Sequence, residues 1–191
     1  QALTTAKTEQ PATMDAFLPG VHWLMFSRVP VRILGLALFA TCAALLAFGL
    51  YLQHIQGIEP CPMCIMQRYA MMVCGVLGLI TGLHNPRGRG LLVYAALLAA
   101  SALAGAGIAA RQSWMQWYPP AVSECGPGLE YMLESFPLSS ALPMIFRGAG
   151  DCSAIDWTLL GLTIANWSFL VFASILLGLG VFLLQRRKTR H

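Results

Sequence analysis

A pair of cysteines separated by two residues lies at the boundary between a polar segment and a long apolar one. Residues 59–62 are Glu-Pro-Cys-Pro, and the chain from Cys64 to Leu83 is apolar with few exceptions. Because proline is favoured at the first position of a helix, we expect Pro62 to begin one and Cys61 to cap it. Unpaired backbone N–H groups and the helix dipole favour a thiolate there, so they are expected to lower the pKa of Cys61.

Arg68 falls on the same stripe of this expected helix as Cys61 and Cys64. A charge inside a membrane helix is costly, so Arg68 either faces protein, ligand or water or extends to the headgroups. A disulfide between Cys61 and Cys64 closes a very short loop and stabilises little, which favours exchange over crosslinking. We interpret the pair as a dithiol–disulfide centre that passes electrons to an acceptor in the bilayer.

The composition indicates a membrane protein. Of the 191 residues, 57% are hydrophobic and only 10% are charged, which exceeds what a soluble domain of this size needs. The net charge of +4 comes from basic residues that flank the apolar segments instead of forming one patch, so it does not indicate nucleic-acid binding. Four of the six cysteines lie outside the apolar runs, which indicates an oxidising compartment on one side of the membrane.

These features predict an all-α membrane protein, a four-helix transmembrane bundle with one long outer loop. Each apolar stretch reaches the roughly 20 residues that a span needs, and small residues in the third favour a central position in the bundle. Trp157 and Trp167 are expected to anchor the fourth span at the interface, and Cys42 and Cys74 to fill apolar space within spans. The expected spans are Val31–Leu52, Pro62–Leu83, Gly90–Ala110 and Thr163–Leu184.

The basic residues predict the orientation. Because most of them lie on the side of both termini, the positive-inside rule places the termini and the turn at residues 84–89 in the cytoplasm and the cysteine-bearing loops outside. We expect residues 1–26 to be a poorly ordered cytoplasmic leader and 27–185 to be the membrane domain, with outer loops at about 53–61 and 111–162. Residues 186–191 form the expected basic cytoplasmic tail. The basic residues on that side are Lys7, Arg28, Arg32, Arg87, Arg89, Arg186, Arg187, Lys188 and Arg190.

A second pair of cysteines, Cys125 and Cys152, lies in the expected long loop without the spacing of a second C-x-x-C. Several arrangements remain open: exchange between the two pairs, a zinc site built from all four cysteines, or two structural disulfides. Residues 138–146 form a short apolar segment interrupted by proline. This segment is either an amphipathic element on the membrane surface, which lets Cys152 lie near Cys61, or a buried loop patch.

Four sequence motifs follow one another along the chain: Cys61-Pro-Met-Cys64-Ile-Met-Gln-Arg68, Arg111-Gln-x-Trp114-x-Gln116-x-Tyr118-Pro119, Glu124-Cys125-Gly-Pro-Gly through Pro137, and Gly150-Asp-Cys152 with Asp156-Trp157 through Gly161. From about Val31 to the end of the fourth span, the chain resembles the bacterial disulfide bond formation protein B family, DsbB. The resemblance implies an inner-membrane oxidoreductase that re-oxidises a periplasmic DsbA-type thiol oxidase and reduces a quinone, ubiquinone or menaquinone.

The resemblance also implies roles for individual residues. Cys125 is the sulfur that the reduced DsbA-type partner attacks, and Cys152 helps to resolve the mixed disulfide. Electrons then pass to the disulfide between Cys61 and Cys64. In these terms Cys64 faces the quinone and Arg68 helps to hold it.

At Gln112 the chain departs from family members that carry histidine near the quinone. An amide donates a hydrogen bond but supplies no proton near neutral pH, so a binding role alone is transferred to Gln112. No metal site is expected. Two alternatives remain: an enzyme like vitamin K epoxide reductase, whose C-x-x-C usually lies near the end of a later helix, and a non-catalytic scaffold with structural disulfides or zinc. Re-oxidation by quinone after mild reduction distinguishes a relay from a scaffold.

Overall fold

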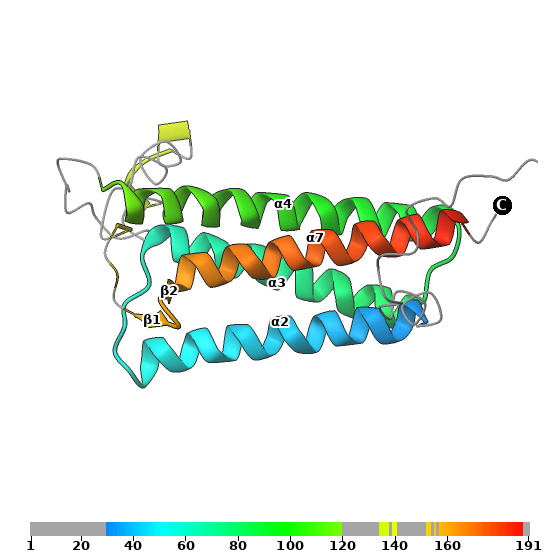
Figure 1. Cartoon of the computed structure of the whole chain (residues 1–191), viewed down its shortest axis with the longest axis horizontal. Coiled ribbons are helices and arrows are strands. Elements are labelled where there is room, and N and C mark those ends of the chain that lie inside the picture. The colour runs from blue at the N-terminus through cyan, green and yellow to red at the C-terminus, as the bar shows by residue number, and fades with distance from the viewer. Residues whose placement is uncertain are drawn as a thin grey trace, which may run out of the picture.

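The computed structural model describes residues 30–119, 134–137, 139–140, 152–153, 155 and 157–188. Four long helices in these residues form a bundle (Figure 1), and each is long and apolar enough to cross a membrane. The predicted four-helix membrane bundle is therefore confirmed. The expected leader, Cys125 and most of residues 138–146 lie outside the described residues. The elements are α2 (Val31–His54), α3 (Pro62–His84), α4 (Arg89–Trp117), β1 (Thr158–Leu159), β2 (Leu162–Thr163) and α7 (Ile164–Lys188).

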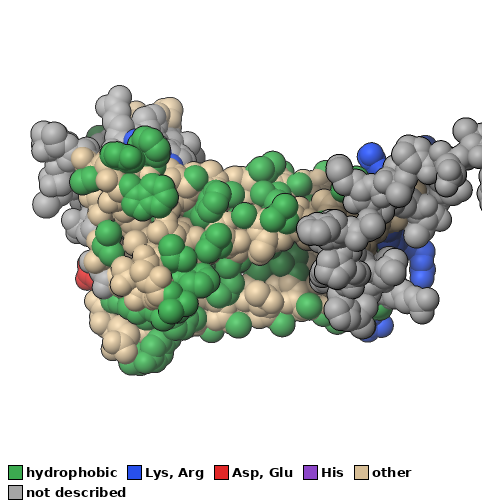
Figure 2. All heavy atoms as spheres, viewed as in Figure 1, with side chains coloured by type: hydrophobic (Ala, Val, Ile, Leu, Met, Phe, Trp, Pro, Cys, Tyr) green, Lys and Arg blue, Asp and Glu red, His purple; other side chains and the backbone are tan. Residues whose placement is uncertain are grey.

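The helices alternate in direction and pack in sequence order, α2 on α3, α3 on α4 and α4 on α7 (Figure 1). One end of the bundle holds Cys61 and Cys64 at the start of α3, and we call it the thiol end. The opposite end holds the α3–α4 turn and the end of α7; we call it the basic end, because Lys and Arg side chains gather there (Figure 2). Hydrophobic side chains cover much of the bundle between the two ends in the same view.

The third span is longer than the sequence predicts. The expected helix ends at Ala110 and the expected outer loop begins at Arg111, but α4 continues to Trp117. The polar residues after Ala110 indicated an exit from the bundle. Instead Gln112 is 3% exposed, and its amide is hydrogen-bonded to α3. A buried amide is tolerated where it is hydrogen-bonded, so the polarity of these residues does not mark the end of the helix.

Glycines allow α2 and α3 to approach each other backbone to backbone. A Cβ atom added to Gly35 would lie 2.6 Å from the carbonyl oxygen of Gly78 and 2.6 Å from the amide nitrogen of Gly82. Small residues on facing helices are a common way to pack membrane spans. The sequence predicts this kind of packing for the third span, where Gly105 does make room for the ring of Phe172. The α2–α3 contact is an additional one that the sequence analysis missed.

Alanine at position 35 is therefore expected to destabilise the bundle. The new methyl group would overlap backbone atoms of α3 that have no room to rotate aside, and overpacking of this kind costs about 1–3 kcal/mol. Gly107→Ala is the matched control, because nothing lies within 4 Å of a Cβ added there and alanine favours the helix. Thermal unfolding of both variants in detergent is the measurement. Equal melting temperatures for the two would contradict the close contact.

The middle of the bundle is filled by a cluster around Phe172, which is fully buried. Cys42 and Cys74 belong to this cluster, with Met71 and the small residues Ala102 and Ala106 of α4. The prediction that these two cysteines fill apolar space is confirmed. A second, smaller cluster at the thiol end packs against the dithiol.

Candidate functional site: a dithiol beside an apolar cavity

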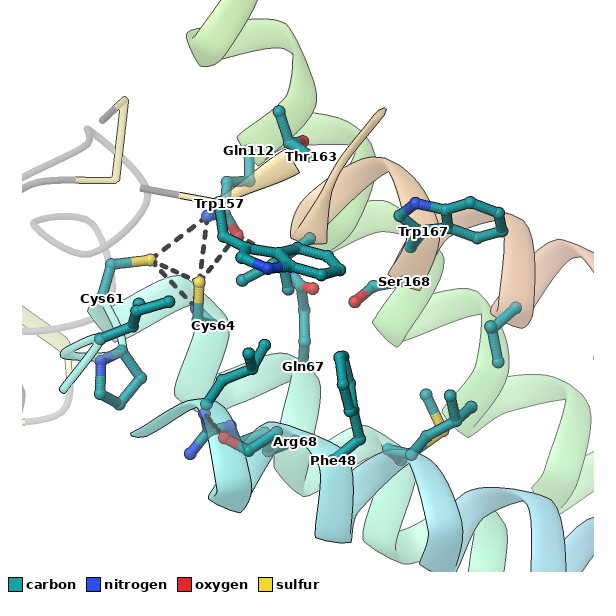
Figure 3. Close-up of a pocket in the computed structure, with 18 of the residues that line it drawn as sticks. Phe48, Cys61, Cys64, Gln67, Arg68, Gln112, Trp157, Thr163, Trp167 and Ser168 are labelled. Atoms are coloured by element: carbon teal, nitrogen blue, oxygen red, sulfur yellow. Dashed lines mark hydrogen bonds between the residues drawn. The ribbon is translucent and has the colours of Figure 1, made fainter. Parts of the chain in front are cut away.

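The two cysteines of the C-x-x-C motif face each other at the first turn of α3 (Figure 3). Pro62 is the first residue of the helix and Cys61 is its N-cap, as predicted. The sulfur of Cys61 accepts the backbone N–H of Cys64 at 3.3 Å, which uses one of the N–H groups that a helix start leaves unpaired. The Cys61 thiol in turn donates to the Cys64 sulfur, and the two Sγ atoms lie 2.9 Å apart.

A buried amide from α4 holds both sulfurs. Nε2 of Gln112 donates to the Sγ atoms of Cys61 and Cys64 at 3.3 and 3.1 Å. The orientation of this amide is set by Gln67 of α3, whose Nε2 donates to Oε1 of Gln112 at 2.6 Å. The Gln112 oxygen accepts this short bond from Gln67 and a longer one, at 3.7 Å, from the Cys64 thiol, while its NH₂ group is directed to both sulfurs. Gln67 and Gln112, which we call the amide chain, are almost fully buried, at 4% and 3% exposure. Because buried polar groups need hydrogen-bond partners, losing any of these hydrogen bonds would destabilise the fold.

Cys152 lies next to Cys61. It is fully buried in a small cluster with Met63 and Met115, against which Cys61 packs. The hydrogen bond with Cys152 is the largest influence on Cys61, and together with the bond to Cys64 and burial it raises the pKa of the Cys61 thiol well above its ordinary range.

The sequence-based expectation for the pKa of Cys61 is thus wrong for the dithiol form. The helix N-terminus does supply an N–H donor to Cys61, but the neighbouring sulfurs accept the Cys61 proton, so losing that proton would break these bonds. The effect comes from Cys152, which is distant in sequence. The proximity of Cys152 to Cys61, one of the arrangements left open by the sequence, is present in the structure.

An apolar cavity of about 290 Å³ adjoins the dithiol. All four helices and the β-hairpin line it, and apolar side chains such as Phe48 of α2 and Val171 of α7 form most of the wall. Cys61, Cys64 and the two glutamines of the amide chain supply a polar patch at one side. Such a combination of an apolar wall with a few convergent polar groups is typical of a small-molecule site. The cavity lies at the thiol end of the bundle, and residues of all four candidate membrane spans line it.

Arg68 also lines the cavity, one helical turn beyond Cys64. Its guanidinium is half-buried and directed to α2, where Nη1 donates to Oε1 of Gln53 and Nη2 donates to the carbonyl oxygen of Gly49 at 3.1 Å. Both partners are protein atoms, so Arg68 connects the thiol-end part of α2 to α3. Its position on the cavity wall agrees with the predicted placement, and its contact with a ligand stays a prediction.

The structure thus brings Cys61, Cys64, Cys152 and Gln112 together and places Arg68 on the same cavity, while Cys125 lies outside the described residues. Gln67 was missed as a site residue. The available signal was a polar residue in an apolar span, which is expensive in a membrane and is a functional candidate by default. Its partner on α4 is not evident from sequence, because 45 positions separate the two glutamines.

Four membrane-spanning helices with a C-x-x-C dithiol at one end, beside a cavity between the helices, define a membrane protein built for thiol chemistry at the bilayer surface. The family model described as Disulfide bond formation protein DsbB matches residues 31–182. The chain belongs to the DsbB family, which confirms the resemblance drawn from its motifs.

Individual relatives agree with the family assignment. A protein of Azoarcus sp. is 70% identical over 159 residues, which cover 83% of this chain and 95% of that protein. A protein of Aromatoleum aromaticum is 58% identical, with 82% and 94% of the two chains covered. One from Verminephrobacter eiseniae is 55% identical over 88% of this chain and 93% of its own length. All three bear the name Disulfide bond formation protein B.

Proposed function

We propose that this protein is a thiol:quinone oxidoreductase that re-oxidises a periplasmic DsbA-type thiol oxidase and passes the electrons to a membrane quinone. The observation that carries the proposal is the position of a dithiol in the wall of an apolar cavity between membrane helices. The name shared by the relatives, Disulfide bond formation protein B, supports an oxidoreductase that forms disulfides.

Two exchange steps connect the partner to the dithiol of α3. A partner thiolate attacks Cys125 of a Cys125–Cys152 disulfide and releases the Cys152 thiolate. The second partner thiol then attacks the mixed disulfide, so the partner leaves oxidised and Cys125 is reduced. The Cys152 thiolate attacks Cys61 of the Cys61–Cys64 disulfide and releases the Cys64 thiolate. Attack by Cys125 on Cys152 restores the outer disulfide and leaves Cys61 and Cys64 reduced.

The described residues suit this second exchange. Because Cys152 packs against Cys61, the attacking sulfur and its target are already neighbours. The Cys64 thiolate that leaves is met by the NH₂ group of Gln112, and hydrogen bonds to a charged acceptor are stronger than those to a neutral one. Gln67 keeps that NH₂ group in place. The protein thereby stabilises the sulfur that must next give up its electrons.

The cavity beside Cys64 supports a quinone as the acceptor. The wall is apolar, and the donors available to carbonyl oxygens come from Arg68 and the amide chain. A bound ubiquinone or menaquinone supplies the acceptor for two electrons and two protons, which the dithiol releases as the Cys61–Cys64 bond forms. DsbA has a potential of about −120 mV, roughly 100 mV above the glutathione pool, so oxidation by that pool is unfavourable by about 4–5 kcal/mol. A membrane quinone is a stronger acceptor that reaches the cavity through the bilayer.

The charge distribution supports a location in the bacterial inner membrane. Arg87, Arg89, Arg186 and Arg187 lie at the basic end, which the positive-inside rule assigns to the cytoplasm together with both termini. The thiol end then faces the periplasm, which is the oxidising side. This orientation places the outer cysteines on the same side of the membrane as a soluble periplasmic partner.

The test uses purified protein in proteoliposomes with ubiquinone and a reduced DsbA-type partner. The wild type is expected to produce one quinol per partner dithiol oxidised, since each step transfers two electrons. Cys125→Ser is expected to lose turnover with the partner. After reduction by dithiothreitol, the same variant should still be re-oxidised by ubiquinone, because the dithiol of α3 is intact.

Partner turnover at the wild-type rate in Cys125→Ser would refute the assigned relay. A wild-type dithiol that stays reduced after quinone is added would refute quinone as the acceptor and favour a structural role for the cysteines. Cys42→Ala is the matched control, because this cysteine lies in the central apolar cluster, away from the dithiol. It is expected to retain turnover.

A further inference from the structure

The β-hairpin before α7 turns through two residues that both have positive φ. Leu159 pairs with Leu162, and the residues between them, Leu160 and Gly161, have φ of 55° and 78°. This is the type I′ geometry of tight hairpins, which strongly favours asparagine or aspartate followed by glycine. Gly161 fits the second position at no steric cost. Leu160 does not fit the first, because a bulky side chain rarely adopts positive φ.

Leu160 gains little protein contact in return for this conformation, since it is 85% exposed. Leu159 beside it is 48% exposed. From Trp157 to Trp167 the chain carries no charged residue. A tight turn with apolar residues at its tip is unusual in water, where polar residues dominate such positions.

The hairpin lies at the depth of the membrane spans. Trp157, just before β1, packs edge-on against Phe48 of α2 with ring centroids 5.7 Å apart. Phe48 lies six residues before the end of α2 at His54, which is about 9 Å along a helix that rises about 1.5 Å per residue. Trp167 in the first turn of α7 donates its indole N–H to the carbonyl oxygen of Leu159 at 3.2 Å. The hairpin segment is therefore attached to α2 and α7. Its contact on α2 lies about 9 Å before the end of that helix.

We propose that the tip of this hairpin is a lipid anchor, in which Leu160 with Leu159 inserts among the acyl chains of the leaflet at the thiol end. The exposed side chain of Leu160 then lies in the hydrocarbon of the leaflet. Trp157 and Trp167 then lie near the membrane interface, where tryptophan side chains are favoured. Phe169 and Leu170, near the start of α7, are also exposed apolar residues.

The anchor has a structural consequence for the cavity. Leu159 forms part of its wall. Trp157, Phe48 and Trp167 lie in the same wall (Figure 3). Trp157 packs on Phe48 of α2 and Leu159 accepts a hydrogen bond from Trp167 of α7, so the hairpin segment connects the first and last helices beside the cavity. Lipid contact at the tip then helps to keep Trp157 against Phe48, in addition to the hydrogen bond from Trp167 to Leu159.

The depth of the tip tests the proposal. A fluorescent amino acid is placed at position 160 of the full chain, in vesicles of phosphatidylcholine and phosphatidylglycerol, and quenching by phosphatidylcholine brominated on its acyl chains is measured. Leu177, which is 70% exposed on α7, is the reference inside the membrane, and the exposed loop residue Gln56 is the reference outside. Quenching at position 160 of at least half that at position 177 is expected. Quenching below half would overturn the proposal.

A pair of substitutions separates the anchor from the turn. Asn-Gly is the preferred type I′ sequence, so turn chemistry alone predicts that Leu160→Asn slows hydrogen exchange of the hairpin amides. The anchor predicts the opposite, a several-fold faster exchange in vesicles, because asparagine does not partition into hydrocarbon. Leu160→Met keeps an apolar side chain without a branch at Cβ and should exchange at the wild-type rate. Unchanged α4 exchange in each sample verifies an intact bundle, and exchange in Leu160→Asn at or below the wild-type rate refutes the anchor.

Discussion

Replacing Cys64 with serine is expected to abolish quinone-dependent re-oxidation and to let Cys61 form a disulfide with Cys152. A serine oxygen cannot close the bond to Cys61, so the dithiol no longer releases its electrons as a disulfide. The Cys61 thiolate can still attack Cys152 of the outer disulfide and release the Cys125 thiolate. Alkylation of the released Cys125 removes it from the equilibrium, so the Cys61–Cys152 disulfide accumulates. Peptide mapping by mass spectrometry without reductant identifies it.

Cys152 is expected to be the cysteine that bonds to Cys61, because these two residues pack together. Cys152 is buried in the cluster against which Cys61 packs, and it raises the pKa of the Cys61 thiol through a hydrogen bond. The reaction should be faster as the pH rises, because exchange requires the Cys61 thiolate. Cys61→Ser is the matched variant; it should lose quinone reduction equally but form no disulfide between Cys64 and Cys152. Equal crosslinking in both variants would contradict the assigned order.

The sequence predicts the spans and the helix cap because these depend on local properties. Long apolar runs define α2, α3 and α7 to within a few residues, and Pro62 after Cys61 defines the start of α3. The end of α4 could not be predicted in the same way. Its polar residues are retained in the helix because Gln112 meets Gln67 across the bundle, and such a partner has no signature in the local sequence.

The hairpin and the acidity of Cys61 show the same limit. Leu-Gly is a poor type I′ sequence, so no local rule indicates a turn at Leu160. The N-cap position of Cys61 correctly predicts its bond to the Cys64 amide. The direction of its pKa shift is nevertheless decided by Cys152, from a different segment of the chain. Local rules therefore locate the reactive pair, while its chemistry depends on contacts between distant segments.

Gln112→Met is expected to slow re-oxidation of the reduced dithiol by ubiquinone about 10- to 100-fold. The lost hydrogen bonds end on both sulfurs, at 3.3 and 3.1 Å. A bond to a charged acceptor contributes about 1.5–3 kcal/mol, and about 1.4 kcal/mol corresponds to a tenfold change in rate. Methionine has a similar length and no donor, so the packing of α4 is kept while the support for a thiolate is removed. Stopped-flow measurement of quinol formation after reduction by dithiothreitol gives the rate.

Two variants of Gln67 show whether the orientation of the Gln112 amide is what matters. Gln67→Met keeps the Gln112 donor but frees its oxygen, so a smaller loss than in Gln112→Met is expected. Gln67→Glu is expected to lose as much as Gln112→Met, because a carboxylate accepts only and turns the NH₂ group of Gln112 away from the sulfurs. Acidification that protonates the new glutamate restores a donor to Oε1 of Gln112 and should recover part of the rate.

Gln56→Met, an exposed site with the same substitution, should leave the rate unchanged. A rate in Gln112→Met within twofold of the wild type would mean that the amide chain contributes to packing alone.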